Sequence, residues 1–243
     1  MQMINTVQFL KNYDVFASQA RYYTAQLFLD ELKNNAELKP NNIKLMKLRI
    51  IEEFISATED LALWLLTVNR RVASTKLDIW DQLLLAEATP EDAVLFLQSL
   101  GRLKSHDSIL NRLNLISSSR LRKQLGLNEK EIEESLEYII KSIKSTIFNR
   151  RINNGALLRT HNKIKHGMVV YLDAKNIDKL LIKDLKMVGQ RNKKRRRYRY
   201  FEINFDLNRA EKLVGNIQTI SHAIRGLIYL VQADFRYRII NGR

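Results

Sequence analysis

The chain contains no cysteine and, among 243 residues, only two prolines and eight glycines. Without cysteine it can form no disulfide and no cysteine-ligated zinc site, and it has no cysteine nucleophile. So few prolines and glycines leave little of the turn chemistry that a many-stranded sheet requires. The composition therefore predicts a mainly α protein built from long helices.

Long apolar runs and common catalytic motifs are also missing. The longest purely apolar runs, such as Leu61–Leu66, are far shorter than the ~20 residues of a membrane helix. Residues 1–14 lack a basic segment followed by an apolar core, so we expect no signal peptide and a cytoplasmic location. There is no Gly-rich phosphate loop, GxSxG or HExxH, and the four histidines are scattered. We therefore expect no cofactor, although carboxylate sites for magnesium stay open.

Positive charge, in contrast, is abundant. Lysine and arginine outnumber the acids by 41 to 26, which gives a formal net charge of +15. A surplus of this size predicts a polyanionic partner, with nucleic acid first. The alternative partners are an acidic membrane surface and an acidic protein. A basic surface that only confers solubility would need no specific partner.

Apolar residues at three- and four-residue steps predict four long helices, over residues 4–34, 43–73, 129–151 and 206–238. Shorter helices are expected at 76–88 and from Pro90 to about Leu103, the second capped by Thr89. His106 is expected in the polar loop that follows, and Pro40 in the turn before the second long helix. With no repeats and no linker, the sequence predicts one domain, an antiparallel helix bundle.

The pattern changes after residue 173. Residues 178–185 are predicted to form one or two helical turns, and Lys186–Val188 a short strand. Residues 200–205 alternate, with Phe201, Ile203 and Phe205 on one face, which is typical of a strand. We therefore expect a small β-hairpin at about residues 186–206, inserted into the helical domain.

The tip of this hairpin is predicted to be strongly basic. Seven cations fall within nine residues, without an acid: Arg191, Lys193, Lys194, Arg195, Arg196, Arg197 and Arg199. Such charges repel one another unless an anion lies among them, and arginine binds phosphate through paired hydrogen bonds. Tyr198 and Tyr200 are interleaved and can stack on bases. The run predicts nucleic-acid binding, with a solvated loop tip as the alternative.

Residues 156–173 are predicted to form a helix with one polar face. Arg159, Asn162, Lys163 and His166 recur at helical spacing, which brings a guanidinium, an amide, an ammonium and an imidazole to one side. Arg159 and His166 lie two turns apart, roughly 10 Å along the axis. His161 falls among apolar residues instead and is expected to be structural, as is His222 in the last helix.

Arg159, six intervening residues and His166 resemble the R-x(4–6)-H motif of HEPN domains. These are all-helical modules, and many are metal-independent ribonucleases of toxin–antitoxin, abortive-infection and CRISPR-associated systems. The residue after the family's arginine is often Asn, whereas this chain has Thr160 there and an Asn only at Asn162. The resemblance implies an endoribonuclease of prokaryotic defence, acting as a homodimer with a composite site.

The resemblance also implies roles for single residues. His166 would transfer the proton between the ribose 2′-OH and the leaving oxygen, because its ordinary pKa is near neutral. Arg159 would hold the scissile phosphate, Asn162 would orient the imidazole or the phosphate, and Lys163 and Lys165 would add positive field. A facing helix would supply an acid, here Glu59 or Asp60, and the product would carry a 2′,3′-cyclic phosphate.

Two other classes of function fit the same residues. A helical protein can bind nucleic acid through the basic hairpin without catalysis. Alternatively, the basic surface can dock an acidic protein, an antitoxin for example.

Overall fold

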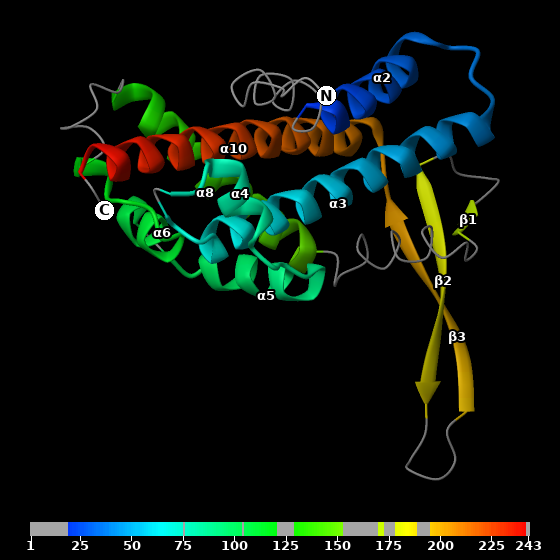
Figure 1. Cartoon of the computed structure of the whole chain (residues 1–243). Coiled ribbons are helices and arrows are strands. Elements are labelled where there is room, and N and C mark those ends of the chain that lie inside the picture. Colours follow the sequence, from blue (N-terminus) through cyan, green and yellow to red (C-terminus); the bar gives the residue numbers. More distant parts are fainter. Residues whose placement is uncertain are drawn as a thin grey trace, which may run out of the picture. The chain divides into compact units, whose positions relative to one another are not determined.

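The computed structural model describes residues 19–74, 76–103, 105–120, 129–152, 170–172, 178–188 and 195–241, and for the strands up to residue 203 it describes the backbone and its pairing. Helices dominate these residues, which confirms the mainly α class (Figure 1). The helices are α2 (Ala20–Asn34), α3 (Pro40–Arg70), α4 (Ile79–Leu84), α5 (Pro90–Leu100), α6 (His106–Arg112), α8 (Glu129–Ile152) and α10 (Leu207–Ile240). The strands are β1 (Val170–Leu172), β2 (Lys179–Val188) and β3 (Arg195–Asn204), in the order β1-β2-β3 and antiparallel throughout.

Several helices begin where the sequence places a capping side chain. The Thr89 hydroxyl accepts a hydrogen bond from the Asp92 amide at 3.2 Å, and Pro90 is the first residue of α5, as predicted. Asp206 accepts from the Arg209 amide at 2.8 Å and caps α10, also as predicted. Each cap satisfies an amide that the first helical turn leaves without a partner.

Two predictions about helix starts were wrong. His106 is the first residue of α6 rather than part of a loop, because Ser105 and Ser108 bond each other's amides in a capping box. Pro40 is the first residue of α3 rather than part of a turn, since a proline needs no amide partner at that position. The helix expected at 76–88 is confined to α4, which Asp78 caps.

Two segments that were predicted to be helical, residues 179–185 and 170–172, are strands instead. Residues 179–185 belong to β2 and not to helical turns, and residues 170–172, the end of the helix predicted over 156–173, form β1. The reason is pairing between distant segments: β3 supplies hydrogen-bond partners along the whole of β2, and β2 supplies them for β1. Such pairing overrides the local pattern of short apolar segments, which fits a helix or a strand equally well.

The chain divides into two compact units. Unit 1 comprises Met1–Tyr22, Ser56–Phe148 and Asn216–Arg243, and unit 2 comprises Tyr23–Ile55 and Asn149–Gly215. Helices α2, α3, α8 and α10 each contribute residues to both units, and the prediction of a single domain stays a prediction.

The core of unit 1 forms where the predicted apolar stripes of α3, α8 and α10 are buried. Its fully or almost fully buried residues include Leu61, Leu65, Val68, Ile132, Leu136, Ile139, Ile217, Ile220 and Leu227. The spacing of three and four residues that predicted these helices therefore also identified the faces that pack.

Helices α8 and α10 run antiparallel within unit 1 and approach each other closely. Along their contacts the residue numbers rise in α8 and fall in α10: Glu131–Tyr229, Ser135–Gly226, Tyr138–His222 and Ser142–Thr219. At the closest point a Cβ added to Gly226 would lie 2.8 Å from the Ser135 Cβ. A glycine is required there because any larger side chain would force the helices apart.

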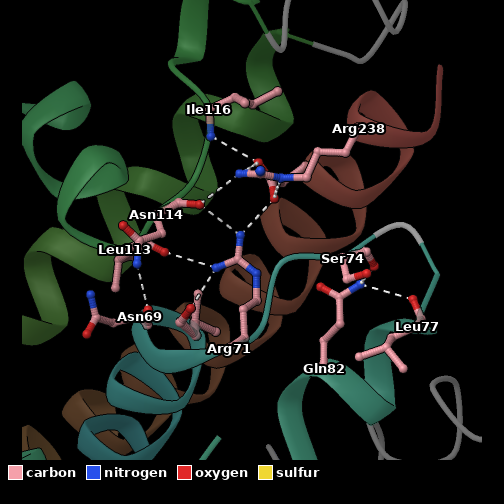
Figure 2. A network of polar contacts seen from close by, with 11 residues as sticks. Asn69, Arg71, Ser74, Leu77, Gln82, Leu113, Asn114, Ile116 and Arg238 are labelled. Atoms are coloured by element: carbon pink, nitrogen blue, oxygen red, sulfur yellow. Dashed lines mark hydrogen bonds and ion pairs between the residues drawn. The ribbon is translucent and has the colours of Figure 1, made fainter. Parts of the chain in front are cut away.

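A buried ion pair joins three segments of unit 1. Arg71 follows the end of α3, and its guanidinium donates at 2.7 Å to Asp234 of α10; the two side chains are 1% and 2% exposed. The same guanidinium donates to the carbonyls of Val68, Leu113 and Asn114 at 2.6, 3.0 and 2.9 Å (Figure 2). Burial lowers the pKa of Arg71 from its ordinary value, and Asp234 offsets part of that effect.

The other lone pairs of Asp234 are also used. Its carboxylate accepts from the Ile116 amide at 3.1 Å and from the Arg238 Nε at 2.8 Å. Asn114 has a left-handed backbone, with φ of 56°, a conformation that asparagine tolerates better than most residues. In this conformation the Asn114 carbonyl accepts hydrogen bonds from both arginines. The bond from the Arg238 guanidinium is 3.2 Å long.

We predict that Asp234→Asn lowers the free energy of unfolding by about 3–5 kcal/mol, because it leaves the buried Arg71 charge unpaired. Arg238→Gln is the matched control, because Arg238 bonds the same carboxylate but its own side chain is 26% exposed. Its removal is therefore expected to lower the free energy of unfolding much less. Urea denaturation followed by circular dichroism measures both. Equal losses would show that the network does not depend on the buried pair.

We predict that Gly226→Ala costs about 1–3 kcal/mol, since the new methyl group has no room against Ser135. Gly215→Ala, in the same helix, meets nothing within 4 Å and should stabilise the protein by about 0.5–1 kcal/mol through helix propensity. Thermal unfolding of both variants and of Ser135→Gly/Gly226→Ala tests the assignment. Compared with Ser135→Gly alone, the double substitution should lose less stability than Gly226→Ala loses in the unmodified protein, because the Ser135 Cβ and Oγ are gone and only its Cα, 3.0 Å away, remains. An equal loss in both backgrounds would place the strain elsewhere.

Candidate nucleic-acid interface

Strands β2 and β3 form a two-stranded antiparallel ribbon in unit 2. Ten residue pairs run without interruption from Lys179–Asn204 to Val188–Arg195 (Figure 1). Strand β1 pairs only with Leu180–Ile182, so the sheet has three strands at one end and two at the other. We call residues 179–182 and 201–204 the ribbon base, and residues 183–188 and 195–200 the basic ribbon.

The charge changes where the third strand ends. The ribbon base carries one cation and one acid, and its remaining positions are Leu180, Leu181, Ile182, Phe201, Ile203 and Asn204. The basic ribbon carries six cations and one acid, a net charge of +5. The base therefore has the composition of a half-buried sheet, whereas the basic ribbon has the composition of a polyanion-binding surface.

The register also determines which residues share a face. Residues that pair directly, and residues two apart along a strand, lie on the same face of an antiparallel ribbon. One face, the arginine face, holds Asp184, Lys186, Val188, Arg195, Arg197 and Arg199. The other, the tyrosine face, holds Lys183, Leu185, Met187, Arg196, Tyr198 and Tyr200.

The arginine face has an unfavourable charge pattern in the absence of an anion. Lys186 is paired directly with Arg197, and like charges in direct cross-strand pairs destabilise a sheet. The acid of this face, Asp184, is paired with Arg199 and leaves the other cations in excess. Because a two-stranded ribbon is marginal in water by itself, a bound anion would remove a cost that the fold otherwise carries.

The ribbon is attached to unit 2 through its base. Phe205, which follows β3, is completely buried, and its amide donates to the Asp178 carbonyl at 2.7 Å. The Asp178 carboxylate in turn accepts from Lys47 of α3 at 2.5 Å. Arg209 of α10 donates to the Asn204 carbonyl at 2.7 Å, and burial lowers the pKa of this guanidinium while Asp206 offsets part of the effect. Both strands are thus tied to helices where they enter the ribbon.

Two lysines that sequence reasoning missed lie in this part of unit 2. Lys44 and Lys47 of α3 are only 2% and 4% exposed, while Leu45 between them is exposed. The three- and four-residue spacing of apolar residues that predicted this helix gave no reason to bury lysine. Lys47 bonds Asp178, which lies 131 residues away in the sequence. Only the folded structure shows that the two residues meet.

The basic run is placed differently from the prediction. Arg195, Arg196, Arg197 and Arg199 lie in β3, so they form part of a strand rather than a loop tip. Arg191, Lys193 and Lys194 lie outside the described residues. The strand position separates the cations by face, which the sequence alone did not predict.

The described part of the chain does not include the predicted catalytic residues. Arg159, Asn162, Lys163, Lys165 and His166 all lie outside the described residues, and their roles stay predictions.

Of the two acids considered as their partners, Asp60 forms an ion pair with Arg21 in unit 1. His222, expected to be structural, stacks on Tyr138 with ring centroids 4.9 Å apart. Burial lowers its pKa, and the nearby Arg225 lowers it further.

Comparison with protein families, with curated proteins and with solved structures finds no match to this chain. In the part of the chain that the structure describes, no helix has the length and apolar composition needed to cross a membrane. Among the same residues, no group of three histidines or carboxylates is arranged to hold a metal ion. The basic ribbon is the candidate site because of its charge and its strand register.

Proposed function

We propose that this protein binds nucleic acid, and RNA in particular, through the basic ribbon. The observation that carries the proposal is the net charge of +5 on twelve paired strand positions, where Lys186 and Arg197 are direct neighbours. Phosphates relieve this repulsion, and arginine binds them through two parallel hydrogen bonds. Release of the counterions around the nucleic acid supplies the driving force.

The arrangement supports binding without sequence reading. Charge attraction to phosphates positions a protein on a nucleic acid but carries no sequence information. The formal charge of the whole chain, +15, has the same sign and would speed encounter with any polyanion. The proposal is therefore an RNA-binding protein whose affinity falls steeply with salt.

RNA cleavage is a second proposal, which the sequence motif favours. In it, two protomers with HEPN-like helices bring Arg159 and His166 to one RNA strand. His166 of one protomer takes the proton of the 2′-OH, the 2′ oxygen attacks the phosphorus as the bond from phosphorus to the 5′ oxygen breaks, and the protonated His166 of the other protomer gives its proton to the leaving 5′ oxygen. Arg159 neutralises the charge of the pentacoordinate phosphorane, and Asn162 orients the reacting groups. The reaction needs no metal and leaves a 2′,3′-cyclic phosphate, in keeping with a toxin or a defence nuclease.

We predict that Arg195→Gln/Arg197→Gln/Arg199→Gln weakens RNA binding and reduces the slope of log K against log salt by about one unit per lost contact. The matched control is Arg102→Gln/Arg120→Gln/Arg236→Gln, which removes the same charge from three exposed positions of unit 1. Fluorescence anisotropy with a labelled RNA, from 50 to 300 mM salt, measures both. Equal effects of the two triple substitutions would show that net charge alone, and not the ribbon, drives binding.

Weak binding by the unmodified protein at physiological salt would instead favour the acidic protein partner.

We predict that the protein cleaves RNA in EDTA to 2′,3′-cyclic phosphate ends, and that His166→Ala abolishes cleavage while His161→Ala retains it. Loss in only the first variant is expected because His161 falls among apolar residues of the predicted helix. Gel analysis of the product ends, before and after acid treatment, checks the chemistry. Intact RNA under conditions where all three proteins bind it would leave binding as the function.

A further inference from the structure

The two faces of the basic ribbon differ in chemistry, although both are basic. The arginine face offers three arginines and a lysine, with no aromatic residue. The tyrosine face offers Tyr198 and Tyr200, with Arg196 and Lys183 at neighbouring positions of the same face. A surface that binds only phosphate needs cations, as the arginine face has. The two tyrosines of the tyrosine face therefore indicate a contact with a part of the ligand other than phosphate.

We infer that the tyrosine face binds unpaired bases, and that the preferred ligand of the ribbon is single-stranded nucleic acid rather than a duplex. This inference rests on the proposed function and names the class of ligand for the same site. Base–aromatic stacking tolerates every base, and it is the contact that proteins use on single strands. In a duplex the faces of the bases are already stacked and closed to a side chain.

The spacing of the two tyrosines fits this ligand. Residues two apart on a strand are separated by about 6.6–6.8 Å. This is about twice the ~3.4 Å rise per nucleotide of a stacked strand. Two rings at that separation can therefore take bases from an unstacked strand or hold one base between them. The cations at 183 and 196 lie on the same face and within one or two positions of the rings along the ribbon, where the phosphates between those bases would run.

The two tyrosines also lie where the sheet has only two described strands. Strand β1 ends its pairing at Ile182, and Tyr200 is paired with Lys183, the first pair beyond it. Tyr198 and Tyr200 therefore both belong to the two-stranded part of the sheet. Among the described strands, neither edge of that part has a third strand as neighbour.

The first test uses the unmodified protein and four labelled probes of twelve residues: oligo(U), oligo(dT), an RNA duplex, and an abasic deoxyribose-phosphate strand. We expect the base-containing single strands to bind more tightly than the abasic strand by roughly 5- to 150-fold for each stacked base. The abasic strand and the duplex should bind with affinities that reflect phosphate contacts only. Equal affinity for the abasic strand and oligo(U), or tighter binding of the duplex, would overturn the inference.

The second test uses Tyr198→Leu/Tyr200→Leu beside Tyr198→Phe/Tyr200→Phe. The leucine variant should bind oligo(U) no better than the abasic strand, with the salt slope unchanged because no charge is lost. The phenylalanine variant keeps the rings and should bind as the unmodified protein does. Full oligo(U) affinity of the leucine variant would contradict the inference.

Failure of the proposed function has a different signature. The unmodified protein would then bind none of the four probes at 100 mM salt. A protein that binds all four with one affinity retains the proposed function and loses only the inference about bases.

Discussion

A guanidinium that is almost completely removed from water must be neutralised where it lies, and this requirement ties together segments of unit 1 that are distant in sequence. Residues 113–116 and Asp234 meet at Arg71: its guanidinium donates to the Leu113 carbonyl and to the Asp234 carboxylate, which also accepts from the Ile116 amide. The apolar stripes bring α3, α8 and α10 together, and the close approach of Gly226 to Ser135 favours one register between α8 and α10. The ion pair and its carbonyl partners add to that preference, since a shift by one helical turn would leave a buried charge unpaired.

In unit 2 the cations of the basic ribbon outnumber its acids, so most of their charge is not neutralised within the ribbon. The ribbon base is held by a third strand, by the buried Phe205 that follows β3 and by the Lys47–Asp178 pair, all of which belong to the protein itself. Beyond Ile182 the apolar residues become fewer and the cations accumulate. Stability is therefore concentrated at the base, and the basic ribbon is the part of the sheet whose energy depends on what binds to it. A binding surface built in this way exchanges intrinsic stability for affinity.

Much of the fold was predictable from the sequence because long helices carry redundant signals. The faces of α3, α8 and α10 followed from repeated apolar spacing, and Thr89 and Asp206 marked helix starts through hydrogen bonds within a single turn. Only the end of strand β2, Lys186–Val188, was predicted as a strand. The apolar residues before it fit a helix or a strand, and only pairing with β3 decides between them. Buried Lys44 and Lys47 escaped for the same reason. The basic run was evident from the sequence, but its division into two faces required the register.

The short length of β1 has a consequence for how copies of the protein behave together. Beyond Ile182 no third described strand pairs with either edge of the ribbon, and strand edges without a neighbouring strand recruit strands from other molecules. Like charges on every copy keep these edges apart, so the same cations that attract a polyanion also protect the protein from assembling with itself. A polyanion that neutralises the ribbon removes this protection, and light scattering should therefore rise as the complex approaches charge balance and fall again when ligand is in excess. Colloidal stability and ligand binding are coupled through the same few side chains.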